Sequence, residues 1–147
     1  MTSQPQEQPI EAAAVVCDAD EVSARFLARA LSRAGLTVHT CGTAAQCETL
    51  VDTEHPDLIV LSLLLPDVDG LTLVRRLRMQ YAANTAHVSA STGDQTPRII
   101  LVSALQAATR AAEAGADAFF GKPVPVPQLL STVRAFFAMT SPQKEAP

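Results

Sequence analysis

Short and almost continuous apolar runs recur along the chain and predict β-strands that are buried on both faces. These runs cover residues 12–17, 37–41, 58–61, 99–102 and 118–120. A strand with one face in water alternates apolar and polar residues, and these runs do not. They are typical of a parallel sheet that carries helices on both sides.

Amphipathic segments separate the apolar runs and predict helices. They cover residues 21–34, 44–53, 71–81, 107–114 and 127–139. In the first, Val22, Phe26, Leu27 and Leu31 form one apolar stripe, and Gly35 is well placed to end the helix. Five repeats of strand then helix predict an α/β fold, a doubly wound five-stranded parallel sheet with five helices.

Three segments fall outside this pattern. Residues 1–10 and 141–147 are polar and contain Gln and Pro, so we expect a disordered N-terminal tail and a C-terminal tail or linker around one domain at 11–140. Residues 82–97 are rich in Ala, Ser and Thr, and connections in such folds usually take about 2–6 residues. We therefore predict a loop insertion at 82–97, either a solvent loop or a binding loop.

Composition excludes several classes of protein. With 48% hydrophobic and 18% charged residues, the 147-residue chain can bury a core and is not expected to be disordered. A net charge of −4 without a basic patch argues against direct contact with nucleic acid. No apolar run approaches the about 20 residues of a membrane helix, and the polar N-terminus does not resemble a signal peptide. We expect a cytoplasmic protein that does not bind membranes.

The three cysteines, Cys17, Cys41 and Cys47, form no C-x-x-C pair and have no accompanying His cluster. This spacing favours buried free thiols over a disulfide framework or a zinc site.

Polar residues follow the predicted strands at their carboxyl ends, where open parallel sheets bind ligands. From the N-terminus, these residues are Asp18, Ala19 and Asp20 after the first strand, Ser62 after the third, Ser103 after the fourth, and Lys122 with Pro123 after the fifth. Pro66 and an Asp69-Gly70 turn come soon after Ser62.

This succession of motifs resembles the receiver domain of bacterial two-component response regulators, over residues 12–139. The resemblance implies a CheY-like, flavodoxin-like fold and a cis bond between Lys122 and Pro123. It also implies a switch hydroxyl at Ser103, an aromatic switch position at Phe119 and a phosphoacceptor Asp four residues before Pro66. That Asp would bind magnesium together with an acid pair after the first strand and one backbone carbonyl, here that of Leu64.

Two departures from the family pattern affect this chemistry. Ser62 stands at the phosphoacceptor position, and Ala19 stands at the second position of the acid pair. The residual metal ligands are Asp18 and the Leu64 carbonyl, and Lys122 balances the charge of Asp18. We expect no catalytic residue, no cofactor and at most weak magnesium binding, because Mg²⁺ prefers several oxygen ligands with carboxylates among them.

The remaining residues near this pocket have ordinary structural roles that we expect to apply. Asp20 and Glu21 would stabilise the N-terminus of the first helix, although either could reach a metal. Lys122 would pair with Asp18 or bond to Ser62. Ser103 would act as a switch or as a plain strand-end hydrogen-bonding group, and a Phe at position 119 favours a fixed place in the core.

The sequence therefore predicts a degenerate receiver, or pseudo-receiver, that is not an enzyme and acts by phosphorylation-independent protein–protein contact. The expected partner is a histidine kinase or a downstream effector, bound on the face of the fourth helix, fifth strand and fifth helix; a homodimer stays open. Alternatives are phosphorylation of Ser62, a phosphorelay through Asp67 or Asp69, and a regulatory domain at the N-terminus of a longer regulator. An enzyme or flavin binder on this scaffold is disfavoured because no Gly-rich phosphate loop follows the first strand.

Overall fold

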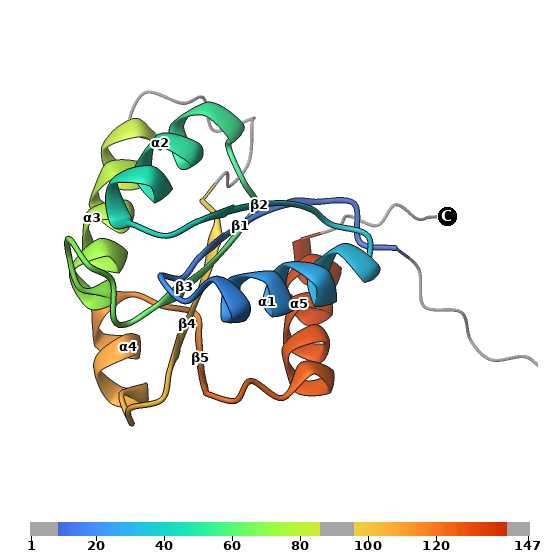
Figure 1. The fold of residues 1–147 in the computed structure, drawn as a ribbon. Helices are drawn as coiled ribbons and strands as arrows, with labels where there is room; N and C mark the ends of the chain where they lie inside the picture. Colours follow the sequence, from blue (N-terminus) through green and yellow to red (C-terminus); the bar gives the residue numbers. More distant parts are fainter. Residues whose placement is uncertain (1–8, 86–95, 141–147) are drawn as a thin grey trace, which may run out of the picture.

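The computed structural model describes residues 9–85 and 96–140. Strands and helices alternate without exception along these residues (Figure 1). In chain order they are β1 Ala13–Cys17, α1 Glu21–Arg33, β2 Thr37–Cys41, α2 Ala44–Glu54, β3 Leu58–Ser62, α3 Gly70–Thr85, β4 Arg98–Ser103, α4 Ala108–Ala114, β5 Ala118–Gly121 and α5 Val126–Thr140. The predicted order of five strands and five helices is confirmed.

The strands form one parallel sheet in the order β2-β1-β3-β4-β5. The strand order reverses at β1, because β2 lies on one side of β1 and β3 lies on the other. All five residues of β3 are buried, as expected for a central strand that is covered on both faces. The carboxyl ends of β1, β3 and β4 therefore meet at one edge of the sheet.

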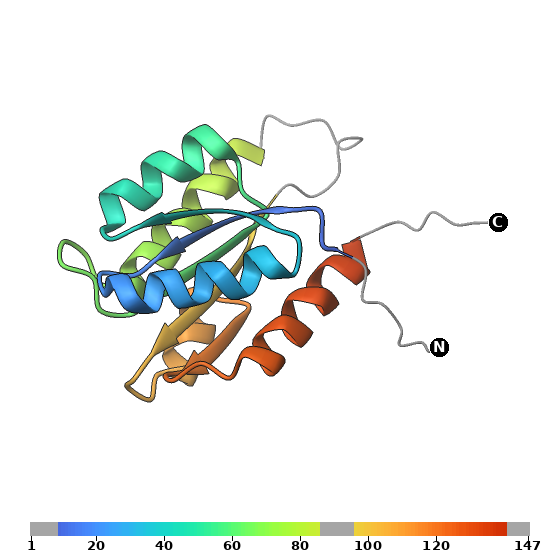
Figure 2. The ribbon, with the colours of Figure 1, turned by 45° about the vertical axis from the view of Figure 1, so that its right-hand side comes forward.

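The helices cover the two faces of the sheet in unequal numbers (Figures 1 and 2). On one face, α2, α3 and α4 pack over inward-facing residues such as Val15, Ile59 and Leu101. On the other, α1 and α5 pack over Val16, Val60 and their neighbours. None of the helices in the described ranges combines the length and the apolar character needed to span a bilayer.

The ends of α1 follow the sequence signals. Asp20 is the N-cap, and its carboxylate accepts a hydrogen bond from the backbone N–H of Val22 at 3.0 Å. Gly35, directly after the C-cap, adopts a φ of 112°, which few residues other than glycine tolerate. Its neighbour in space is Ile10, which is buried in the core and donates to the Ala34 carbonyl. The predicted tail at 1–10 is therefore one residue too long, because Ile10 belongs to the folded body.

The predicted loop insertion at 82–97 begins too early, because its first residues belong to α3. The structure extends α3 to Thr85, whereas the sequence pattern ended the helix at residue 81. Alanine at position 82 favours helix, and no Gly or Pro interrupts the segment before residue 85. Arg78 fixes this part of α3 by donating to the carbonyls of Gly115 and Pro97. Residues 86–95 of the predicted insertion lie outside the described residues.

Candidate functional site

The carboxyl ends of β1, β3 and β5 bring together three of the predicted site residues. Cys17 pairs with Leu61 in the β1–β3 register, so Asp18, directly after β1, lies beside Ser62, the last residue of β3. Lys122 follows β5 and crosses the edge to Asp18, where its Nζ lies 2.7 Å from Oδ2. We call Asp18, Ser62 and Lys122 the pocket residues.

The Asp18–Lys122 ion pair is the main electrostatic feature of this pocket. The Asp18 side chain is only 3% exposed and that of Lys122 is 23% exposed, so water screens the pair poorly. The second carboxylate oxygen of Asp18 accepts a hydrogen bond from the Asp20 backbone N–H at 3.0 Å. Both oxygens of this carboxylate are thus engaged by the protein itself.

Ser62 is buried at the end of β3 and bonds within its own loop. Its hydroxyl donates to the Leu64 carbonyl at 3.5 Å, the same carbonyl that the family resemblance implies as a metal ligand. The turn is tight: Gly70 donates to the Leu63 carbonyl at 2.7 Å. A Cβ at Gly70 would collide with the Ser62 carbonyl and would lie 2.8 Å from the Cα of Leu63. The backbone at Ser62 is therefore held closely, whatever side chain the position carries.

The other acidic residues near β1 do not join Asp18. Asp20 caps α1 and accepts from Val22 and, at 3.5 Å, from the Ser23 hydroxyl. Glu21 begins α1 and its carboxylate lies 4.0 Å from the guanidinium of Arg25. Ala19 is exposed and offers no ligand. The predicted helix-terminus roles of Asp20 and Glu21 are confirmed.

The two acids of the turn after β3 point to helix N-termini. Asp67 accepts from the backbone N–H groups of Ala44 and Ala45 at 2.8 and 3.0 Å, and the first of these bonds is the main reason that the pKa of Asp67 is lowered. Asp69 accepts from the backbone N–H of Thr72 at 2.9 Å, which likewise lowers its pKa. Both carboxylates are fixed as helix caps, away from the pocket residues.

The positions that the resemblance marked as switches have local partners. The Ser103 hydroxyl is buried and accepts from the backbone N–H of Leu105 at 2.9 Å, a contact that fits the strand-end role. Phe119 packs against the core under α3 and α4 but is only half-buried. Phe119 also lines a surface hollow with Arg110 and Lys122. The prediction that its ring is fixed in the core therefore holds for only one side of the ring. The bond between Lys122 and Pro123 is cis, as the resemblance implied.

On the predicted docking face, the structure separates core residues from surface residues. Val124, Leu129 and Val133 are buried against α1, and Ala107, Ala111 and Ala114 are buried against α3. Exposed residues lie both on α5, among them Gln128, Ser131 and Ala135, and along the start and outer side of α4. Those at α4 are Ala104, Leu105, Gln106, Ala108, Thr109, Arg110, Ala112 and Glu113.

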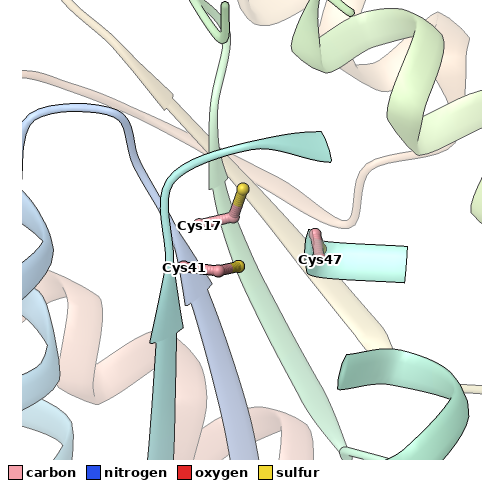
Figure 3. Close-up of side chains that lie close together, drawn as sticks. All are labelled: Cys17, Cys41 and Cys47. Carbon is pink, nitrogen blue, oxygen red and sulfur yellow. The ribbon is translucent and has the colours of Figure 1, made fainter. Parts of the chain in front are cut away.

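The structure also gathers three residues that the sequence did not connect. The sulfur atoms of Cys17, Cys41 and Cys47 all lie within 4.8 Å of one another (Figure 3). As predicted, the cysteines are free thiols, with Cys17 and Cys47 fully buried and Cys41 half-buried. A signal was present, because Cys17 and Cys41 each end a predicted strand and neighbouring parallel strands end at the same edge. Their spacing matched no local metal motif, and the contribution of Cys47 depends on how α2 packs.

Comparison with known proteins identifies the relatives of this fold. The family described as response regulator receiver domain matches residues 14–134. Response regulator MprA of Mycobacterium avium (strain 104) is 31% identical over 134 residues, which are 90% of this chain and 54% of that protein. Response regulator MprA of Mycobacterium sp. (strain KMS) is 32% identical over 132 residues, which are 88% of this chain and 52% of that protein. The chain spans about half the length of these curated relatives.

Solved structures agree on the fold. A putative response regulator from Chloroflexus aurantiacus superimposes with a TM-score of 0.74 at 23% identity, over 88% of this chain and 99% of that chain. The receiver domain of Francisella response regulator 1452 gives the same values. At this identity the likeness establishes the CheY-like arrangement of the chain.

Proposed function

This chain belongs to the response regulator receiver domain family of two-component signalling, and from that premise we propose that it signals without aspartyl phosphorylation. It acts as a protein–protein interaction module in which Lys122 neutralises the remaining acid of the pocket. The observation that carries this proposal is the 2.7 Å contact between Lys122 and Asp18, beside a serine at the phosphoacceptor position.

The charge balance of the pocket supports the proposal. In the family pattern, three carboxylates and one lysine sum to −2 and balance a divalent cation. Here the single carboxylate of Asp18 and the amine of Lys122 sum to zero. The Leu64 carbonyl, the remaining implied ligand, already accepts from Ser62. These residues do not fit magnesium, which takes near-octahedral oxygen ligands and gives up water reluctantly.

The nucleophile is equally unsuited to phosphoryl transfer. A hydroxyl attacks phosphorus only when a neighbouring base or metal removes its proton. The Ser62 hydroxyl bonds to a backbone carbonyl, which is not a base at physiological pH. The acids of the following turn, Asp67 and Asp69, are engaged by backbone N–H groups at helix N-termini. Neither the serine alternative nor the phosphorelay alternative is favoured by these contacts.

The partner surface that we propose is the exposed outer side of α4 together with the half-buried ring of Phe119. Leu105 is 54% exposed at its edge, and Thr109, Arg110 and Glu113 supply polar groups around it. An apolar residue inside a polar rim is the usual composition of a protein–protein contact. The partner is a histidine kinase or a downstream effector of the same signalling system.

A phosphodonor experiment tests the neutralised pocket. The full chain is incubated with Mg²⁺ and acetyl phosphate, and its intact mass is measured. We expect no added phosphoryl group, because the pocket lacks both the carboxylate nucleophile and the metal site. A base-labile adduct on an aspartate would overturn the proposal in favour of a phosphorelay, and an acid-stable adduct on Ser62 would favour modification of that serine.

A binding experiment tests the surface. A partner captured with the wild-type chain from its native source is titrated against Arg110→Glu, with Arg29→Glu on exposed α1 as the matched control. If Arg110 is an anchor, its charge reversal should weaken binding by about 2 kcal/mol or more, and the control should leave it unchanged. Acetyl phosphate should not alter the wild-type affinity. A response to the phosphodonor would contradict the phosphorylation-independent module.

A further inference from the structure

The three cysteines, here called the thiol cluster, converge because of sheet register and helix packing. Cys17 ends β1, Cys41 ends β2, and the two residues pair directly in the parallel register. Cys47 lies in the first turns of α2, which covers this end of the sheet, so that it lies close to Cys17 and Cys41 (Figure 3). Cys17 and Cys47 are joined through one carbonyl: Thr43 accepts from the Cys17 thiol at 3.4 Å and from the Cys47 N–H at 3.0 Å.

The dimensions of the thiol cluster suit a small metal ion. The sulfurs lie within 4.8 Å of one another. A trigonal ion with metal–sulfur bonds of about 2.3 Å needs sulfurs about 4 Å apart, because they stand at the corners of an equilateral triangle around it. The sulfurs therefore need to approach by less than about 1 Å, which small rotations of the cysteine side chains supply.

We propose that the thiol cluster binds one Cu(I) ion through three thiolates. Thiolates are soft ligands that select Cu(I), zinc and iron–sulfur clusters. Structural zinc sites take four protein ligands, and in the described residues no His, Asp or Glu atom joins the three sulfurs. Cu(I) is satisfied by three sulfurs alone. On binding, the thiol protons are released to solvent, and no change of oxidation state is involved.

The surroundings support this choice of ion. Cys17 and Cys47 belong to the apolar core under α2 and α3, together with Val51 and Leu61, so two of the three ligands are shielded from water. Cys41 is the accessible member, because it lines two surface hollows, one with Gly42 and Gln46 and one under α2 with Thr49 and Leu50. The ion can reach the cluster, and protons can leave it, through Cys41.

The order of ligation follows from exposure. The half-buried sulfur of Cys41 is the first ligand that an incoming cation meets, and the buried thiols of Cys17 and Cys47 follow as their protons leave to solvent. This inference is independent of the proposed function, since the cluster shares no side chain with the pocket residues.

The test is a titration of the reduced full chain with Cu(I) in the absence of oxygen, against bathocuproine disulfonate as a coloured competitor. We expect one tightly bound Cu(I) per chain, three sulfur neighbours by X-ray absorption, and no displacement by excess Zn²⁺. Substitution of residues that contact only the ligands of a metal lowers its affinity by up to about 100-fold. Cys41→Ser removes a ligand itself, so it should lower the affinity for Cu(I) by more than that. Cys41 is half-buried on an edge strand, so this variant should fold.

Controls separate ligation from packing. Cys47→Ala should also abolish tight binding, whereas Val51→Ala, one turn further along the same buried side of α2, should retain it despite a similar loss of core volume. An affinity for Cu(I) that is equal in wild type and Cys41→Ser would overturn the proposal. Two sulfur neighbours with nitrogen or oxygen ligands, or displacement of copper by Zn²⁺, would overturn the three-thiolate copper site.

Discussion

The two polar sites at the carboxyl edge of the sheet are adjacent in sequence and opposite in character. Asp18, one residue after β1, is held in an ion pair with Lys122, while Cys17, the last residue of β1, faces two further thiols. In the pocket every strong ligand already has a partner within the protein. In the thiol cluster, Cys17 makes a weak hydrogen bond to the Thr43 carbonyl.

The contrast lies in whether a potential metal ligand already has a charged partner within the protein. An ammonium group 2.7 Å from a carboxylate balances its charge, which is why we expect the pocket to gain little from a metal. The three sulfurs of the thiol cluster lie within 4.8 Å of one another, and in the described residues no ion pair is formed by any of them. Each of the following predictions changes one site and uses the other as its reference.

The largest effect is expected when the ion pair is broken. Lys122→Met leaves the buried Asp18 carboxylate without its cation, which should destabilise the fold by about 3 kcal/mol in chemical denaturation. The double variant Asp18→Asn with Lys122→Met should recover much of that loss, because no unpaired charge remains. Affinity of the thiol cluster for Cu(I) should not change. A loss below about 1 kcal/mol would mean that the pair behaves as a surface contact.

Restoring the missing carboxylates should open the pocket to a cation. Wild type should show no magnesium site tighter than the millimolar range, about −4 kcal/mol. Ala19→Asp with Ser62→Asp should tighten magnesium binding at least tenfold, or about 1.4 kcal/mol, as followed by calorimetric titration.

The matched control for this restoration is Ala19→Asn with Ser62→Asn, which adds the same bulk without charge. It should bind magnesium as weakly as wild type. A micromolar magnesium site in the wild-type chain would show that Asp20 or Glu21 moves into the pocket, against the cap geometry described above.

The cap at the start of α3 should give a moderate and pH-dependent effect. Because the Thr72 N–H holds the pKa of Asp69 below its ordinary 3.8, the ionised cap stabilises the fold fully above that value. This stabilisation is lost as the pH falls through the lowered folded-state pKa. Asp69→Ala should cost about 1 kcal/mol at neutral pH, with the difference from wild type shrinking below pH 3.8 in urea denaturation.

Asp69→Asn provides the control for this measurement, since it keeps an acceptor oxygen that does not titrate. It should retain most of the stability and lose the acid dependence. A difference between wild type and Asp69→Ala that persists unchanged at low pH would show that the carboxylate charge is not what the helix terminus uses.

The smallest effect is expected at the phosphoacceptor position itself. The hydrogen bond from Ser62 to Leu64 is long, so Ser62→Ala should change the free energy of unfolding and the affinity for a partner by no more than about 0.5 kcal/mol. Denaturation and partner titration measure the two quantities. A collapse of partner binding with the fold intact would mean that the hydroxyl takes part in signalling.

The fold was predictable because each element carries its own local signal. The uninterrupted apolar run that ends at Ser62 and the Asp20–Gly35 pair around α1 specify strand and helix without reference to the rest of the chain. The extension of α3 to Thr85 was missed, since alanine and asparagine at its end carry little periodicity and the helix is fixed by contacts of Arg78 with distant carbonyls.

The pocket was predictable from motif order, whereas the thiol cluster was not predicted. Asp18, Ser62 and Lys122 each follow a strand in a familiar succession, and their ion pair was foreseen as one of two outcomes. The contact of Cys17 with Cys41 depends on strand register, and the approach of Cys47 to both depends on helix docking. Strand register and helix docking are tertiary properties, and they cannot be read from the spacing of the cysteines in the sequence.

The closeness of Gly70 to the Ser62 carbonyl has a consequence for how such a domain can diverge. The turn after β3 is fixed by a backbone contact that admits no side chain, so its shape does not depend on which residue precedes it. A lineage can therefore exchange the residue at position 62 without losing the architecture around it. The reactive side chain and the scaffold that holds it can therefore change independently in evolution.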